Sequence, residues 1–146
     1  MKGGVNMKEK RNVHLKVQEL CDCYATNDPL KEMSTIKNEE DQDEAALKWL
    51  ALTALHGVNS NAEKITISRS KDGEINVTAN YRRSELPSPG SDVGTKILEA
   101  VREITHIESD KGKTPLALGI RNDSIEVQVE MTSEEGKENV TLKFPE

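Results

Sequence analysis

The longest apolar-rich stretch of the chain runs from residue 44 to residue 58 and reads EAALKWLALTALHGV. It holds the only tryptophan of the sequence, Trp49. Apolar residues recur at helical spacing on two sides of this segment, which predicts a helix that is buried on two faces rather than one. Such a helix needs cover on both sides, and this requirement constrains the rest of the fold.

A second segment, fifty residues further along, repeats one of these two apolar faces and lacks the other. Each of the two helices is followed by a pair of segments with alternating polarity, which predicts a hairpin of strands at 64–82 and again at 113–131. We therefore interpret residues 41–82 and 91–144 as two helix–hairpin repeats, with one further strand at 138–144. The aligned helix residues are Leu47 with Ile97, Leu50 with Ala100, Ala51 with Val101, Ala54 with Ile104, and His56 with His106. The aligned strand residues are Ile65 and Ile67 with Leu116 and Leu118, and Ile75, Val77, Ala79 and Tyr81 with Ile125, Val127, Val129 and Met131.

The predicted fold class is α+β. The two repeats would form a mostly antiparallel five-stranded sheet with helices packed mainly on one face, because a unit of one helix and two strands cannot bury its apolar face alone. Residues 12–40 are predicted to form an N-terminal helical extension, and residues 1–11, which are polar and lack periodicity, to be disordered. Residues 12–146 would then form a single domain.

The face of the first helix that the second repeat lacks consists of Trp49, Leu52 and Leu55. The aligned residues of the second helix are polar, so this face needs a cover of its own. The N-terminal helices could supply it, and a dimer partner is the alternative, since an exposed apolar patch usually marks an interface. We favour the N-terminal helices and keep these three residues as a possible interface. The N-terminal residues expected to provide the cover are Val13, Val17, Leu20 and Tyr24.

Composition excludes several classes of protein. The net charge is −6, from 20 basic and 26 acidic residues, which opposes binding to nucleic acid through clustered Lys and Arg. Two cysteines cannot form the framework of a disulfide-rich secreted module. No secretory signal is recognisable, and no apolar run approaches the ~20 residues that span a bilayer. We therefore expect a soluble cytoplasmic protein that does not bind nucleic acid or membranes.

The sequence carries no common catalytic motif: the serine nucleophile elbow, the phosphate-binding loop, the dinucleotide fingerprint and the zinc-protease helix are all missing. Cys21 and Cys23 would point to nearly opposite sides of a helix, which predicts one buried and one exposed thiol rather than a metal site. His56 and His106 fall at equivalent helix ends, where the helix dipole would stabilise an imidazolium. We expect no catalytic residue, metal ligand or cofactor, and an enzymatic role is disfavoured.

The outward face of the sheet is the remaining place for a ligand. Four residues near the proline-containing loop at 84–91 form a candidate ligand face: Asn80, Arg82, Arg83 and Arg121. The more ordinary interpretation is a solvated face of an antiparallel sheet, in which one side is wet. The other polar residues expected on this face are Thr66, Ser68, Ser70, Asn76, Thr78, Glu126, Gln128 and Glu130.

These observations favour a non-enzymatic protein–protein interaction or assembly module, whose partner is another protein or a second copy of the chain. One alternative is a small-molecule-binding protein or enzyme that uses the polar sheet face and the loop at 84–91. Another is a small acidic chaperone that acts as a dimer, which would suit the size and the net charge.

Overall fold

The structure is a computed structural model, and it describes residues 5–79, 84–120 and 123–145. The chain has an α+β fold in which three α-helices precede the first strand and a fourth lies between the strands. The helices are α1 (Val5–Cys23), α2 (Pro29–Ser34), α3 (Gln42–Asn59) and α4 (Ser91–Thr105), with a short 3-10 helix at Ile36–Asn38. The strands are β1 (Lys64–Arg69), β2 (Ile75–Ala79), β3 (Ser84–Glu85), β4 (Lys111–Ile120), β5 (Asp123–Glu134) and β6 (Lys137–Lys143).

The strands form one sheet in the order β3-β2-β1-β6-β5-β4, and all neighbouring strands run antiparallel. The α+β class and the antiparallel sheet are therefore confirmed. All five predicted strands are present, and the two-residue β3 adds a sixth beyond β2. The last strand in the chain, β6, lies in the middle of the sheet, between the two hairpins.

Two tight turns fix the registers of this sheet. Gly73 adopts φ 87° between β1 and β2, as the sequence predicts for a hairpin. Between β5 and β6, Glu135 and Gly136 have φ 50° and 84°, so only two residues separate the paired residues Glu134 and Lys137. Positive φ at both central residues is typical of the tight hairpin turn whose twist matches the strands. As a result β5 runs three residues further than the predicted end at residue 131.

The strand order gives the predicted duplication no structural support. β1 and β4, the first strands of the two hairpins, run in opposite directions, yet in each hairpin the second strand lies on the side toward β3. Suppose that the second hairpin is rotated by half a turn within the plane of the sheet, so that β4 points in the same direction as β1. β5 then lies on one side of β4, whereas β2 lies on the other side of β1, so the two hairpins have opposite handedness. The pattern of inward residues is the same for hairpins of either handedness. Two helix–hairpin units that differ in handedness can therefore still align in sequence.

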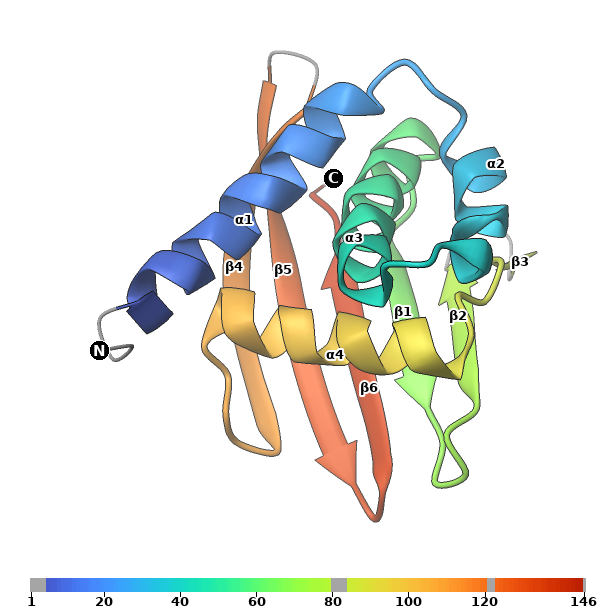
Figure 1. Cartoon of the computed structure of the whole chain (residues 1–146), viewed down its shortest axis with the longest axis vertical. Coiled ribbons are helices and arrows are strands. Elements are labelled where there is room, and N and C mark those ends of the chain that lie inside the picture. Colours follow the sequence, from blue (N-terminus) through green and yellow to red (C-terminus); the bar gives the residue numbers. More distant parts are fainter. Residues whose placement is uncertain (1–4, 80–83, 121–122, 146) are drawn as a thin grey trace.

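The core lies between the sheet and the helices, and Figure 1 shows α1, α3 and α4 in front of the sheet, with α4 crossing the strands. The inward positions predicted from alternation are buried or partly buried in all five long strands, apart from Tyr81, which lies outside the described residues. Fully or nearly fully buried are Ile65, Ile67, Ile75, Val77, Ala79, Leu118, Ile120, Val127, Val129, Met131, Val140, Leu142 and Phe144. Leu116 and Ile125 are partly buried against the same core.

Helix ends follow the sequence in part. Asp28 caps α2, accepting a hydrogen bond from the Leu30 N–H at 3.1 Å, and Pro29 occupies the first turn, where its missing N–H costs no hydrogen bond. α4 has Gly90 as its N-cap, with φ 89° and no side-chain capping bond, although Ser91 and Asp92, which directly follow, are residue types that favour this position. α1 differs, because it begins at Val5 instead of residue 12. Residues 7–11 are Met, Lys, Glu, Lys and Arg, which all favour helix, so the helix extends beyond the periodic apolar stripe.

Candidate functional site

The face of α3 that carries Trp49, Leu52 and Leu55 lies in the core of the chain. These side chains are exposed by 1%, 0% and 0%, respectively. Both α1 and α2 pack against α3, so the N-terminal helices supply cover from within the chain. The buried residues of this cover are Val17 and Cys21 on α1, Met33 on α2, and Ile36 of the 3-10 helix. The three residues proposed as a possible interface therefore offer no surface to a partner.

Lys48 of α3 contacts charged and aromatic side chains of the N-terminal segments. Its Nζ atom lies 4.9 Å from the centre of the Tyr24 ring and 3.7 Å from carboxylate oxygens of both Glu32 and Glu39. Burial disfavours the charged form of Lys48, but contact with Tyr24 and the two carboxylates outweigh it and leave the pKa raised. The side chain therefore stays charged and holds three segments together, which is a structural role.

The two cysteines do not form a metal or redox site. Cys21 is buried, with its Sγ 4.0 Å from the Ala51 carbonyl oxygen, and burial raises its pKa to about 12. Cys23 is exposed, and both thiols are free. Within the described parts of the chain, no three His, Cys, Asp or Glu side chains are grouped so that they could hold a metal ion.

The histidines occupy three different environments. His56 is buried within the last turns of α3, and burial lowers its pKa, so the predicted dipole-stabilised imidazolium is wrong for this residue. His106 is the exposed C-cap of α4, with φ 61°. The helix α3 that carries His56 and the helix α4 that ends at His106 have their C-terminal ends in different parts of the molecule (Figure 1). His14 lies on α1, with Nε2 2.9 Å from the Ala117 carbonyl oxygen.

The candidate ligand residues Asn80, Arg82, Arg83 and Arg121 lie outside the described residues. The segment that follows the first three of them in the chain packs along β2. Leu86 is buried and its N–H donates to the Val77 carbonyl at 3.0 Å, while the Ser88 hydroxyl donates to the Ile75 carbonyl at 2.9 Å.

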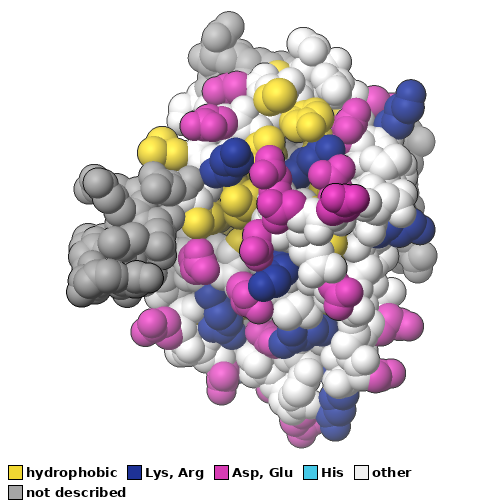
Figure 2. All heavy atoms as spheres, viewed as in Figure 1, with side chains coloured by type: hydrophobic (Ala, Val, Ile, Leu, Met, Phe, Trp, Pro, Cys, Tyr) yellow, Lys and Arg dark blue, Asp and Glu magenta, His cyan; other side chains and the backbone are white. Residues whose placement is uncertain are grey.

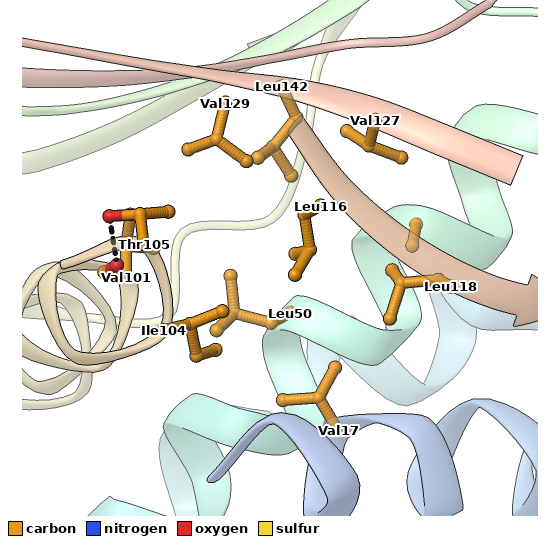
Figure 3. Close-up of a pocket in the computed structure, with 11 residues that line it drawn as sticks. Val17, Leu50, Val101, Ile104, Thr105, Leu116, Leu118, Val127, Val129 and Leu142 are labelled. Atoms are coloured by element: carbon orange, nitrogen blue, oxygen red, sulfur yellow. Dashed lines mark hydrogen bonds between the residues drawn. The ribbon is translucent and has the colours of Figure 1, made fainter. Parts of the chain in front are cut away.

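One apolar hollow lies between α1, α3, α4 and the sheet (Figure 3). Its volume is about 20 Å³, little more than one water molecule needs. Its only polar lining group, the Thr105 hydroxyl, donates to the Val101 carbonyl at 2.7 Å. No polar group is left to orient a ligand or to take part in chemistry, so the hollow is best described as a packing gap. Its lining includes Val17, Leu50, Ile104, Leu116, Leu118 and Val129.

The outward face of the central strands has a different character, because its polar side chains bond to one another. The hydroxyls of Thr66 and Thr141 lie 3.1 Å apart across β1 and β6. The Ser68 hydroxyl donates to Asn139 at 2.5 Å, and the Asn139 amide donates to Thr132 at 3.5 Å. These contacts run across β1, β6 and β5 and form an ordered polar surface.

This outward face is also basic. Lys64 and Lys143 lie directly opposite each other on β1 and β6. Glu130 accepts a hydrogen bond from Lys143 at 2.7 Å, and this bond, with the nearby charges of Lys113 and Lys64, holds the pKa of Glu130 below its usual range. By strand alternation, the charged residues described on this face are Lys64, Lys111, Lys113, Lys137 and Lys143 against Glu126, Glu130 and Glu134.

The helix side contrasts with this face, since acidic side chains are spread over it (Figure 2). A lysine-rich sheet face on a chain of net charge −6 therefore means that charge is unevenly divided between the two sides. Sequence reasoning missed Lys64, Lys113 and Lys143 as a group. Part of this grouping could be predicted, because strand alternation places all three lysines on the polar face. The rest could not, because the lysines come together only when β6 lies between β1 and β5.

No protein-family model matches this chain, and no curated protein is similar enough in sequence to be counted as a relative. None of the helices in the described ranges has both the length and the apolar character needed to cross a bilayer.

Proposed function

We propose that this protein is a non-enzymatic protein–protein interaction module, that its contact surface is the open face of the sheet, and that its partner presents acidic side chains to that face. The observation that carries the proposal is the pairing of Lys64 directly opposite Lys143. Like charges in directly opposed positions destabilise a sheet. Among the residues that the structure describes, Glu130 alone forms an ion pair with either lysine, through Lys143. An acidic group from a partner would relieve this repulsion.

The form of the surface favours a protein partner. The helices cover one face of the sheet in this proposal, and the exposure of outward residues such as Asn76, Thr78 and Glu126 supports an uncovered second face. The bonded series of Thr66, Thr141 and other small polar side chains is already ordered, so little side-chain freedom would be lost on binding. Complementary charge then gives specificity and fast association.

Other ligand classes fit this surface less well. Nucleic acids without sequence preference are bound by basic grooves with aromatic stacking platforms, and the described outward positions of the sheet carry no aromatic residue. Small molecules bind in concave pockets lined mainly by apolar groups, whereas the polar side chains of this face bond to one another. A cytoplasmic location suits the proposal, since Cys21 and Cys23 are both free thiols.

Site-specific photo-cross-linking in the source cells would test this function. A photoreactive amino acid replacing Thr141 is expected to give adducts of discrete mass, whereas the same probe replacing Glu103, an exposed position on α4, is expected to give none of them. Introducing Lys64→Glu and Lys143→Glu should abolish the Thr141 adducts. The matched control Lys96→Glu reverses a lysine charge on α4 and should leave them unchanged.

Two results would contradict the proposal. The first is an equal set of adducts from both probe positions. The second is a set of Thr141 adducts that survives both charge reversals. Mass identification of the adduct also separates the partner classes, since a second copy of the chain would identify self-association, and a nucleic acid would show that the assigned partner class is wrong.

A further inference from the structure

A second hollow lies where α3 ends and the chain leaves β6. Its volume is about 560 Å³. Sites for small molecules usually measure roughly 300–1,000 Å³, whereas the hollow of Figure 3 has room for about one water molecule. The second hollow is therefore large enough for an organic ligand. Four segments of the chain line it, through Gly57, Val58, residues 61–63, Ile125, Phe144 and Pro145.

Backbone hydrogen bonds hold the walls of this hollow in place. The Ala62 N–H donates to the Gly57 carbonyl at 2.9 Å, which fixes the turn that follows α3. The Phe144 N–H donates to the Glu63 carbonyl at 2.9 Å, which extends the pairing of β6 with β1 by one residue. Ala62 and Phe144 are also buried. The hollow is therefore preformed, and a ligand would not have to order its walls on binding.

One side of the hollow is apolar. Val58 and Ile125 are only partly buried against the core, and Pro145 is exposed. The Phe144 ring also lines the hollow, and its tip rests against Gly57. Apolar surface of this kind is withdrawn from water when a ligand fills the hollow, which favours a ligand with an apolar body.

The other side of the hollow is polar and negative. Asn61 and Glu63 are exposed, and in the parts of the chain that the structure describes neither side chain forms a hydrogen bond or an ion pair with another residue. The end of α3 borders the same hollow through Gly57 and Val58, and the C-terminal end of a helix carries negative partial charge. None of the described lining residues is a lysine or an arginine. This side therefore favours a positively charged group.

We infer that this hollow binds a small organic ammonium ion, with its apolar body against Phe144 and Ile125 and its ammonium group beside Glu63. An ammonium group has N–H donors and no acceptor, so it can donate both to the Glu63 carboxylate and to the side-chain oxygen of Asn61. Hydrogen bonds between charged groups are stronger than those between neutral groups. The inference does not rest on the partner proposed for the open sheet face, because Phe144 and Ile125 belong to the inward side of the strands.

Other small ligands fit this hollow less well. An anion would lie near the Glu63 carboxylate and the negative end of α3, without a basic side chain among the described lining residues. A metal ion would need more ligands, and no three His, Cys, Asp or Glu side chains are grouped for one in the described ranges. An uncharged apolar molecule would gain from the apolar side alone.

An NMR titration of the isotope-labelled full-length chain tests this inference. The probe is tryptamine, whose indole ring is the apolar body and whose amine is charged at neutral pH. It should shift the amide signals of Val58, Asn61, Glu63 and Ile125. Tryptophol, which carries a hydroxyl group in place of the ammonium group, should bind roughly 3- to 10-fold more weakly. Butylamine, which resembles the side chain of a partner's lysine and lacks the ring, should bind at least about 10-fold more weakly.

A charge-removing variant locates the ammonium group. Glu63→Gln keeps the size of an exposed side chain and removes its charge, so the chain should still fold. The affinity for tryptamine should fall to about that for tryptophol, and the affinity for tryptophol should not change. Glu108→Gln is the matched control, because Glu108 is an exposed carboxylate that lines a separate hollow beside α4. It should change neither affinity.

Several results would overturn the inference. One is that tryptamine at millimolar concentration leaves the signals of Val58, Asn61, Glu63 and Ile125 unshifted. Another is that tryptophol or butylamine binds as tightly as tryptamine, since the charge or the apolar body would then not be recognised. A third is that Glu63→Gln binds tryptamine as tightly as the unaltered chain does. Indole-3-propionate, which carries a carboxylate on the same ring, should bind most weakly of the indole compounds, and tighter binding than that of tryptamine would also contradict the assigned charge.

Discussion

Gly57 of α3 packs directly on the ring of Phe144, just beyond β6. A Cβ atom on Gly57 would lie 2.1 Å from the ring carbon Cζ, far inside contact distance. Glycine lowers the stability of a helix relative to alanine. At this position its lack of a side chain allows the Phe144 ring to pack against the helix. The contact joins the most buried helix to the central strand of the sheet.

The first prediction is that Gly57→Ala destabilises the protein by about 1–3 kcal/mol, the usual effect of overpacking a core. Urea unfolding would measure the change. In a Phe144→Ala background the clash is absent, and the same substitution should be neutral or stabilising by up to about 1 kcal/mol, because alanine is the better helix former. Destabilisation of equal size in both backgrounds would show that the ring contact is not its cause.

The second prediction concerns the buried imidazole of His56. Its pKa is lowered from 6.5 in the folded chain, so the unfolded chain binds the proton more tightly. The stability contributed by neutral His56 is therefore present above pH 6.5 and is lost as the pH falls below it. Urea unfolding at pH 7.5 and pH 5 should show a larger loss for the unaltered chain than for His56→Gln.

His106 provides the matched comparison, because it is exposed at the end of α4. His106→Gln, which also replaces a helix-end histidine, is measured beside His56→Gln under the same conditions. If His56→Gln and His106→Gln behave alike, the acid sensitivity arises from carboxylates elsewhere in the chain.

The third prediction is that the folded chain reacts with one equivalent of a thiol reagent at neutral pH. Burial raises the pKa of Cys21 to about 12, so it has almost no thiolate and little access, whereas Cys23 is exposed. Two equivalents should react in urea, and Cys23→Ser should leave the folded chain unreactive. Rapid labelling of folded Cys23→Ser would show that α1 opens readily from the core.

Sequence patterns predicted those parts of the fold that depend on local periodicity. Alternation identified Ile65, Val77, Val129 and Leu142 as inward residues, and the turn signal at Gly73 placed the first hairpin. The same periodicity produced the apparent duplication, because aligned inward residues carry no information on the handedness of a hairpin. Local patterns therefore established the elements and their inner faces, but not their arrangement.

The surfaces of interest depend on contacts between distant segments, which a local pattern does not contain. Gln18 and Gly119 meet only because β4 is at the edge of the sheet, and Lys64 meets Lys143 only because β6 inserts beside β1. A glutamine on the polar side of a helix and lysines on polar strand positions are each ordinary in sequence. What is unusual is that each pair joins residues about 80 to 100 positions apart in the chain, and the sequence of a single segment does not predict such a contact.

The fourth prediction separates stability from function on the open sheet face. Lys64→Thr replaces the like-charge pair with Lys143 by a neutral pair, which should stabilise the fold by about 0.2–1 kcal/mol in urea unfolding. The gain should shrink at high salt, because exposed charges are screened. The same substitution should weaken cross-linking from Thr141, since it removes a charge offered to an acidic partner. A variant that is both more stable and fully able to bind would mean that the lysine pair serves no partner.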